Sequence, residues 1–398
     1  MHKSLDEKLA NIHADPSGAT DFIIADAKDA DMAFGIGAPG RSPEAHSGEL
    51  TFRSLAEYRE QMREIVRHGD VDIMLMSAST SEVLTIQERL FQASPITPAV
   101  RVNDTTDIWV LRGASYPADP SQPFRSATID HAQCGHVDCR AEERCLGADL
   151  GLYSITFNNR LEFDLAALEE FGRFRIEAER KGFRHFLELF DPNAPAGLTA
   201  DQIPAFMNDT IARILAGVTE SGRPIFLKMV YHGPQAMEEL ANYDPHFVVG
   251  VLGGSSGTTL DAFKLIQEAQ KYGARLALFG RKINNAEHQT TFVKFLRLIV
   301  EGQVAPEDAV RAYHGVLQQL GIRPQRSLDD DLTLQTAVMH YASTTATVPK
   351  DLPATAGKSG RDSATQSPDF CTMTAAEKLA YNRAKRDRTF GRFGSGDG

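Results

Sequence analysis

A single lysine, Lys228, lies within the apolar segment PIFLKMVYHGP, which runs from Pro224 to Pro234. The segment is rich in β-branched and aromatic residues and is bounded by proline and glycine, which predicts a β-strand. Burying an ammonium group is unfavourable unless the group is paired or its pKa falls. A lysine amine whose pKa is lowered by burial and by a second cation, such as Lys28, can attack a carbonyl carbon and form a Schiff base. Alternatively, Lys228 forms a structural ion pair with Glu188 on the neighbouring predicted strand.

Carboxylates and other polar residues stand near the ends of several further apolar runs. Glu188 is the first candidate partner of Lys228, because a carboxylate beside a Schiff-base lysine can transfer protons. In HFLELF and IFLKMV the two residues stand at similar distances from their strand ends, which predicts that they lie side by side. The other strand-end candidates are Asp26, Lys28, Asp29, Asp31, Asn103, Asp104, Asn158, Asn159, Asp191, Tyr231 and His232.

The elements that must position these residues recur along the chain. Eight apolar runs, each followed by an amphipathic segment, cover residues 21–26, 71–76, 97–103, 150–157, 184–190, 224–230, 246–252 and 274–280. Runs that are apolar on both faces are typical of parallel strands buried on both sides. No glycine-rich dinucleotide fingerprint follows the first run, which disfavours an open doubly wound sheet. The sequence predicts an α/β fold, a (β/α)8 TIM barrel, whose active site lies where the strands end.

Two glycine-containing turns, LGGSSG and FGRK, follow the last two runs. In a barrel, backbone N–H groups of the turns after strands seven and eight commonly hold a phosphate group, and an arginine can close such a site as a bidentate clamp. The turns therefore predict an anion site built from Gly253, Gly254, Ser255, Gly280 and Arg281.

The chain divides near residue 325. We expect a barrel domain over residues 1–325 and a C-terminal extension over residues 326–398. Residues from about 343 to 369 are rich in Ser, Thr, Pro, Gly and Ala, which predicts a linker. A helix is expected from about residue 374 to 390, where Thr374 and Glu377 form a capping box.

Composition and charge disfavour several classes of function. The 398 residues carry a formal net charge of −11, which argues against binding to nucleic acid or to an anionic membrane. No apolar run reaches membrane-spanning length, and the N-terminal segment has no apolar signal core. Four cysteines are too few for a disulfide scaffold. We expect a cytoplasmic homo-oligomer that acts on a small molecule and needs no cofactor.

The ordered combination of short motifs resembles the class I, Schiff-base-forming aldolases, a superfamily of barrel enzymes. The likeness is greatest to the branch of tagatose-bisphosphate and sulfofructose-phosphate aldolases. The deoxyribose-phosphate aldolases and the bacterial and archaeal fructose-bisphosphate aldolases are more distant. The likeness runs from about Asp21 to Gly302, and the motifs that carry it are IIADAKDADM, CLGADLGLYSITF, HFLELF, FLKMV, VVGVLGG and FGRKIN.

This resemblance implies roles for the strand-end residues. Lys228 matches the Schiff-base lysine, Glu188 a carboxylate used in proton transfer, and Asp26 the strand-one aspartate that contacts the reacting hydroxyl groups. Gly253, Gly254, Gly280 and Arg281 match the phosphate-binding turns, and Lys28 and Asn103 complete the predicted site. The chain departs from the tagatose-bisphosphate branch at Leu152, where that branch has a lysine. It departs from the fructose-bisphosphate branch at Phe190, where that branch has a tyrosine acid. The resemblance implies a carbon–carbon lyase for a phosphorylated or anionic ketose.

The segment DHAQCGHVDCRAEERC, residues 130–145, has no counterpart in this family. His131, Cys134, His136, Cys139 and Cys145 are close enough in sequence to bind zinc, although paired CxxC motifs are absent. Free thiols and a solvated histidine are the other interpretation. A metal-dependent barrel enzyme, such as a hydrolase, is therefore one alternative function. A barrel without catalytic activity that binds a sugar phosphate, or a partner through its tail, is another.

Overall fold

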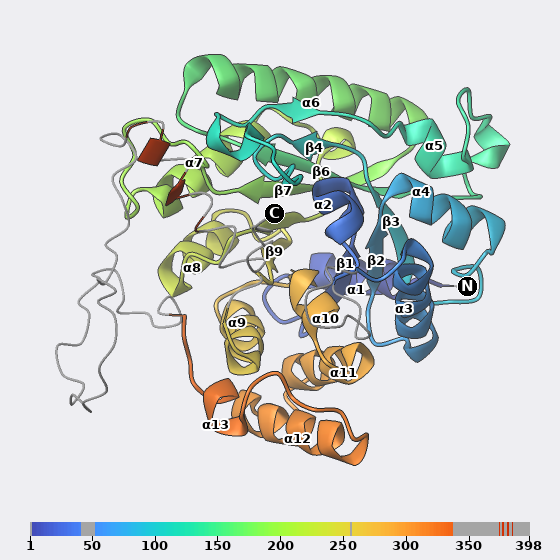
Figure 1. The fold of residues 1–398 in the computed structure, drawn as a ribbon. Helices are drawn as coiled ribbons and strands as arrows, with labels where there is room; N and C mark the ends of the chain where they lie inside the picture. Colours follow the sequence, from blue (N-terminus) through green and yellow to red (C-terminus); the bar gives the residue numbers. More distant parts are fainter. Residues whose placement is uncertain are drawn as a thin grey trace, which may run out of the picture.

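Eight parallel strands form a closed barrel in the computed structural model, which describes residues 2–40, 52–254 and 257–336 and, further on, residues 374, 376, 377, 380, 381 and 384. Their order around the barrel is β1-β10-β9-β8-β7-β6-β3-β2, and each predicted run contributes one strand (Figure 1). The predicted TIM barrel is therefore confirmed. The strands are β1 (Ile23–Lys28), β2 (Ile73–Met76), β3 (Thr97–Arg101), β6 (Leu150–Thr156), β7 (Arg184–Phe190), β8 (Leu227–Met229), β9 (Val249–Leu252) and β10 (Leu276–Phe279).

Helices surround this barrel, with α6 along the top of the view in Figure 1 and α12 and α13 at the bottom. The α-helices of the described residues are α1 (Ser4–Ala14), α2 (Asp31–Phe34), α3 (Leu55–His68), α4 (Ala78–Ser81), α5 (Ile129–Cys134), α6 (Leu161–Lys181), α7 (Ile203–Leu215), α8 (Pro234–Tyr243), α9 (Thr259–Lys271), α10 (Arg281–Asn285), α11 (Gln289–Val300), α12 (Pro306–Gln319) and α13 (Leu328–Asp331).

Short-range signals in the sequence set where several helices begin and end. At the start of α3 the Ser54 hydroxyl accepts a hydrogen bond from the backbone N–H of Glu57 at 3.2 Å, as half of a capping box. α3 ends at Gly69 and α6 at Gly182, where φ is 80° and 60°. Glycine adopts this left-handed conformation without steric cost. The chain then enters β2 and β7, as the sequence predicts.

Successive side chains along each strand point alternately into the barrel and towards the helices, which creates two buried layers. On β1, Ile23, Ala25 and Ala27 belong to an inner apolar layer that the apolar face of α1 joins. α1 lies at the end where the strands begin, because the Ser4 backbone N–H donates to the carbonyl of Pro95, two residues before β3. Even-numbered β1 residues point the other way and pack against the surrounding helices. The strand register therefore shows which layer each side chain enters.

An excursion over residues 104–128, between β3 and α5, was not predicted. It contains the short antiparallel pair β4 (Asp104–Thr105) and β5 (Pro123–Phe124). The single tryptophan, Trp109, stacks on Tyr116 with ring centroids 5.2 Å apart. Thr156, at the end of β6, donates to Asp107 at 3.2 Å. The excursion therefore lies beside the barrel end at which the strands finish, called the mouth below.

The predicted linker, residues 343–369, lies outside the described residues, as does most of the predicted C-terminal helix. Two described residues of that helix do form the predicted capping contacts. Thr374 N donates to Glu377 Oε2 at 2.7 Å, and Glu377 N donates to Thr374 Oγ1 at 3.3 Å. Of the helices in the described part of the chain, none has both the length and the apolar character to cross a membrane.

Candidate active site

Lys228 and Glu188 face each other inside the barrel. They stand at the same register level on β8 and β7, and Phe226, two residues before Lys228, belongs to the inner layer. Lys228 Nζ lies 2.5 Å from Glu188 Oε1, and the two side chains are only 7% and 2% exposed. The geometry suits a structural ion pair, and it also suits a lysine that passes its proton to a carboxylate before attacking a carbonyl carbon.

Arg101, which the sequence did not single out, completes this network. At the end of β3 its Nη2 donates to Glu188 Oε2 at 3.2 Å and its Nε donates to Asp29 Oδ2 at 2.5 Å. Its Nη1 donates at 2.9 Å to the Ser154 hydroxyl, which donates in turn to Glu188 Oε2 at 2.7 Å. Both carboxylate oxygens of Glu188 are therefore held. An arginine within the apolar run TPAVRVN is the same kind of signal as Lys228 and could have identified this residue.

Neighbouring charges keep Glu188 ionised. Burial by itself raises the pKa of a carboxyl group, but Lys228 and Arg101 outweigh burial here, and the pKa of Glu188 lies below its usual value. Burial also opposes the charge of Arg101, yet Asp29, Glu188 and Asp104 raise the pKa of this guanidinium above its usual value. At neutral pH Glu188 is therefore an anion, ready to accept a proton.

Asn103 fixes the position of Ser154. Its Nδ2 donates to the carbonyl oxygen of Ser154 at 2.8 Å, and the backbone N–H of Ser154 donates to Asn103 Oδ1 at 2.6 Å. These two bonds extend the pairing of β3 with β6 beyond the last residue of β3. Both ends of the Asn103 amide are therefore engaged with the backbone of β6. The predicted contact of Asn103 with a substrate stays a prediction.

Asp26 and Lys28 lie on the other face of β1. Asp26 is level with Phe279, a residue of the outer layer, so its side chain faces the helices. Lys28 Nζ donates to side-chain oxygens on α10 and α11 and lies 3.5 Å from Asp26 Oδ2. Burial raises the pKa of Asp26 to about 6 although Lys28 opposes it, and burial lowers the pKa of Lys28. The strand-one carboxylate that reaches the Lys228 network, through Arg101, is Asp29.

Asp104 adds a further carboxylate to this network and makes stability depend on pH. Burial, together with Asp29, Asp31 and Glu188, raises the pKa of Asp104 to about 6, although Arg101 lies 3.9 Å away and acts in the opposite direction. The folded state therefore keeps a proton that the unfolded state has already lost. The fold consequently loses stability as pH rises from the usual aspartate pKa towards about 6.

We expect Asp104→Asn to raise the free energy of unfolding by about 1–3 kcal/mol near pH 8 and to change it little near pH 4.5. The variant removes the charge that the native state disfavours, and urea unfolding at the two pH values measures the difference. Asp209→Asn, on an exposed position of α7, is the matched control and should alter neither value. An equal gain at both pH values would contradict an origin in the ionisation of Asp104.

The first predicted anion-binding turn follows β9. A Cβ atom on Gly253 would lie 2.0 Å from the ring of Phe279, so only glycine fits there. Gly254 has a φ of 59°, in the left-handed region that favours glycine. Gly253 allows the chain after β9 to pack closely against β10, and Gly254 allows the turn that follows β9. Ser255 lies outside the described residues.

The second predicted turn lies directly beside the first. A Cβ atom on Gly280 would come within 2.8 Å of the carbonyl oxygen of Ala27 on β1. Arg281 follows at the start of α10; burial lowers its pKa to about 10, and the negative charge of Glu188 acts against that shift. Lys282 Nζ donates to the carbonyl oxygen of Gly257, which ends the first turn, at 2.7 Å and to that of Thr258, the N-cap of α9, at 2.9 Å, and so ties the two turns together.

Other predicted strand-end residues meet after β7 and β8. His232 Nε2 and Asp191 Oδ1 are 2.8 Å apart. Asn158 Oδ1 accepts from a backbone N–H of the loop after β7 at 2.7 Å, and Asn159 Nδ2 donates to a carbonyl oxygen of that loop at 2.7 Å. The two asparagines therefore shape a loop, while His232 and Asp191 are in contact at the mouth.

The predicted metal segment lies at the opposite end of the barrel. It joins α5 to the start of β6, because the backbone N–H of Gly147 donates to the carbonyl of Gln133 at 2.8 Å, three residues before β6 begins. His131 Nδ1 lies 2.6 Å from the Thr128 hydroxyl at the start of α5. Cys134 and Cys139 converge instead with Glu143, a residue outside the predicted set.

The barrel resembles solved aldolase structures. It matches a fructose-bisphosphate aldolase from Slackia heliotrinireducens DSM 20476 with a TM-score of 0.53 and 14% identity, over 78% of this chain and 91% of that one. An archaeal fructose 1,6-bisphosphate aldolase gives a TM-score of 0.52 and 14% identity, over 74% and 99%. An archaeal fructose-1,6-bisphosphate aldolase with its catalytic lysine covalently bound to the carbinolamine intermediate of the substrate gives 0.50 and 15%, over 74% and 98%.

No protein-family model matches the chain, and no curated protein matches it in sequence. At identities near 15% the structural likeness concerns the fold alone. The chain therefore has the barrel fold of known aldolases, with a buried Lys228–Glu188–Arg101 network near its mouth.

Proposed function

We propose that this chain is a class I aldolase, a carbon–carbon lyase that forms a Schiff base between Lys228 and a phosphorylated or otherwise anionic ketose. The observation that carries the proposal is the contact of Lys228 Nζ with Glu188 Oε1 inside the barrel, at 2.5 Å. Arg101 and Ser154 hold the second oxygen of this carboxylate, and a group that accepts and returns protons must be held in place. The solved aldolase whose lysine carries a carbinolamine supports the same chemistry on this fold.

In the proposed reaction, Glu188 takes a proton from the Lys228 ammonium, and the free amine adds to the carbonyl carbon of the substrate. The resulting carbinolamine loses water and leaves a protonated imine. Removal of the proton from the β-hydroxyl group breaks the carbon–carbon bond, releases an aldehyde and leaves the bonding electrons in an enamine. Protonation of the enamine carbon and addition of water return a ketone and the free lysine.

The surrounding residues suit these proton transfers. Arg101 and Ser154 hold Glu188 Oε2 and leave Oε1 directed at Lys228, so both act as positioning residues. The predicted contact of Asp26 with the reacting hydroxyl groups requires a side chain on the inner face of β1. Asp29 already reaches that face through Arg101, and we favour Asp29 for this role.

The anionic group of the substrate is assigned to the two adjacent turns and Arg281. A guanidinium hydrogen bond to a phosphate group contributes about 1.5–3 kcal/mol. We therefore expect Arg281→Ala to raise KM by roughly 10- to 100-fold with a smaller change in kcat. Steady-state kinetics and competition by inorganic phosphate measure this. Arg173→Ala, on an exposed position of α6, is the control. Equal activity on the non-phosphorylated sugar would contradict the assignment.

A metal-dependent hydrolase is the alternative that the sequence left open. Its predicted ligands lie in α5 and the connection before β6, whereas Lys228 and Glu188 lie near the mouth, so a metal there would be remote from these residues. A barrel that binds a sugar phosphate without catalysis remains the other alternative. In that case the contact of Lys228 with Glu188 would be a structural ion pair, and no imine would be trapped on Lys228.

Reduction with borohydride in the presence of a panel of small ketones, aldehydes and sugar phosphates tests the proposed function. An imine becomes a stable secondary amine on reduction, so mass spectrometry of peptides locates the lysine and weighs the fragment at once. We expect a single adduct, on Lys228. Turnover without any trappable adduct would overturn the imine mechanism.

A further inference from the structure

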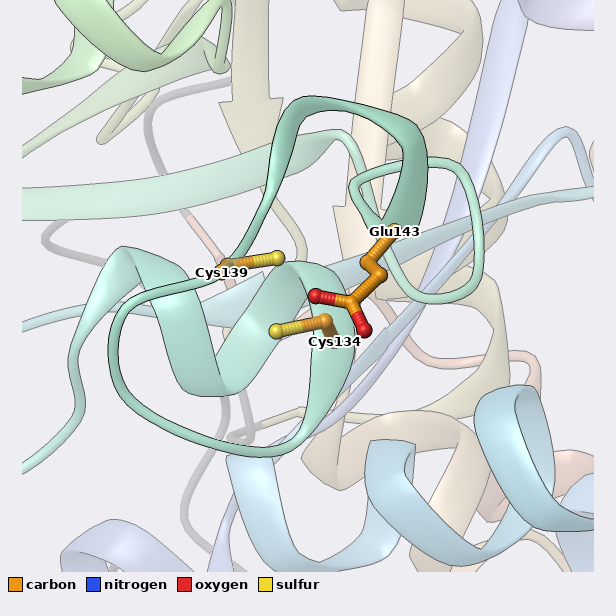
Figure 2. A group of neighbouring side chains, drawn as sticks. All are labelled: Cys134, Cys139 and Glu143. Atoms are coloured by element: carbon orange, nitrogen blue, oxygen red, sulfur yellow. The ribbon is translucent and has the colours of Figure 1, made fainter.

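Cys134, Cys139 and Glu143 converge on the connection between α5 and β6 (Figure 2). Cys134 is the last residue of α5, Cys139 lies on the following loop, and Glu143 ends a single-turn helix over Ala141–Glu143. The two sulfur atoms and one carboxylate oxygen all lie within 4.8 Å of one another. Both cysteines are buried, and the side chain of Glu143 is 18% exposed.

This donor set matches the chemistry of zinc. Zinc binds thiolate sulfur, imidazole nitrogen and carboxylate oxygen at about 2.0–2.3 Å, in a tetrahedron whose ligand atoms are roughly 3–4 Å apart. The observed spacing therefore needs only small side-chain movements. Two soft sulfur ligands favour zinc over magnesium or calcium, which prefer shells of oxygen atoms.

His136 is the candidate for a fourth ligand, although its ring lies outside the group of atoms within 4.8 Å of one another and its side chain is 57% exposed. Its Nε2 lies 3.7 Å from Glu143 Oε2, and its Nδ1 lies 2.8 Å from the carbonyl oxygen of Val137. A carbonyl oxygen can only accept a hydrogen bond, so Nδ1 is the donor in this contact. Nε2, the ring nitrogen near Glu143, is then the one that can bind a metal. Metal-binding histidines commonly donate their other ring N–H to a backbone carbonyl in this way.

The loop that carries these side chains is tied to the helices beside it. The backbone N–H of Asp138 donates to Asp130 Oδ2 at 3.1 Å, and Asp130 Oδ1 lies 2.7 Å from Lys181 Nζ at the end of α6. The exposed side chain of Arg140 donates to Glu143 Oε1 at 2.6 Å, which fixes the carboxylate from outside. Ligands and supporting contacts are thus held by α5 and α6 together.

We propose that Cys134, His136, Cys139 and Glu143 bind one zinc ion, which fastens the loop before β6 to α5. The thiols release their protons to solvent on binding, so two thiolates, one carboxylate and one neutral imidazole surround the ion. Four protein ligands leave no open position for a substrate. The site is structural, lies away from Lys228, and does not depend on the proposed aldolase activity.

Metal analysis of the full chain, purified under reducing conditions, tests the proposal. We expect about one zinc per chain, and replacement by Co²⁺ should give the absorption of tetrahedral cobalt with thiolate ligands. Cys134→Ser and Cys139→Ser should each lower zinc content at least tenfold, and His136→Asn and Glu143→Gln should weaken affinity by about 10- to 100-fold. Cys145→Ser and His131→Asn are the matched controls from the same segment, and each should keep full zinc content.

Several outcomes would overturn this assignment. Wild-type chain, reduced and fully stripped, could fail to take up Zn²⁺ or Co²⁺ in titration, a result that no misfolded variant can cause. Peptide mass spectrometry could show a Cys134–Cys139 disulfide in place of a metal. Loss of zinc in Cys145→Ser with retention in His136→Asn would contradict the ligand set. Borohydride trapping at Lys228 should survive removal of zinc, so failure here is distinguishable from failure of the aldolase proposal.

Discussion

Lys228→Met will abolish borohydride trapping and lower turnover by roughly 10⁴-fold or more. Methionine keeps the length and the apolar stem of lysine but has no nucleophilic nitrogen. The barrel should remain folded, because Glu188 still accepts hydrogen bonds from Arg101 at 3.2 Å and from Ser154 at 2.7 Å. The buried carboxylate loses the contact of Oε1 with Lys228 but keeps the cation Arg101 at Oε2, whereas a charge left without any partner is what makes breaking a buried pair strongly destabilising. Mass spectrometry after reduction, with circular dichroism of the same sample, measures both parts of this expectation.

Lys294→Met, on an exposed position of α11, is the matched control. It removes one lysine from the surface and should leave both the adduct and the turnover unchanged. Labelling that persists in Lys228→Met would show that the imine forms elsewhere. Labelling found only on surface lysines would remove Lys228 from the mechanism, whatever happens to the rate.

The barrel could be predicted because its signal is local and repeated. Each apolar run between amphipathic segments marks one strand, and errors of one or two residues at a boundary do not alter the order of elements. The pair of Lys228 and Glu188 was predictable for the same reason. Two buried charges at matching places on consecutive strands of a barrel must lie next to each other, and they share a register level.

The position of Asp26 shows where this reasoning fails. The first run was predicted to end at Asp26, which would put its carboxylate at the mouth, but β1 runs on to Lys28. Side chains alternate along a strand, so residues with even numbers on β1 face the helices and Asp29 turns inward. The sequence pattern does not distinguish these faces, because both sides of the strand are buried.

The roles of Arg101 and of the excursion over residues 104–128 could not be predicted from the sequence, for a different reason. The partners of Arg101 come from segments after β1, on β6 and on β7, so its contacts exist only once the barrel has closed. β4 and β5 are two residues each, too short to show any periodicity. A buried arginine is visible in the sequence, but the three groups that it joins are not.

Arg101 and Lys228 together define what Glu188 can do. Two cations hold the pKa of Glu188 below its usual value in spite of burial. In the proposed reaction the carboxylate therefore starts as a base, and it becomes an acid only after it has taken a proton from Lys228 or from the substrate. When the carbon–carbon bond breaks, the protonated imine becomes a neutral enamine, so one of the two cationic charges next to Glu188 is lost and the proton can be returned.

Glu188→Gln is expected to separate imine formation from turnover. Glutamine keeps the size but has a single acceptor oxygen, so it can accept either from Lys228 or from Arg101 and Ser154, and it cannot carry a proton. Given time, the variant should still form an adduct that borohydride traps on Lys228, while turnover falls by roughly 10²- to 10⁴-fold. Because the pKa of Glu188 is lowered, wild-type Glu188 is ionised throughout the neutral range, so the deficit should be the same near pH 7 and near pH 8.5. Glu301→Gln, on the surface, is the control for the substitution itself.

A counter-ion would behave differently in the same experiment. If Glu188 only balances the charge of Lys228, glutamine alters the protonation of the lysine and nothing else, so trapping and turnover must change together. A proton shuttle behaves differently, because the steps after imine formation lack a group within reach of the substrate, so turnover falls while trapping persists. Near-normal turnover in Glu188→Gln would remove Glu188 from the mechanism and shift the proton transfers from Glu188 to Asp29, because Arg101 already holds Asp29 next to the network at 2.5 Å, whereas the predicted alternative, Asp26, faces the helices.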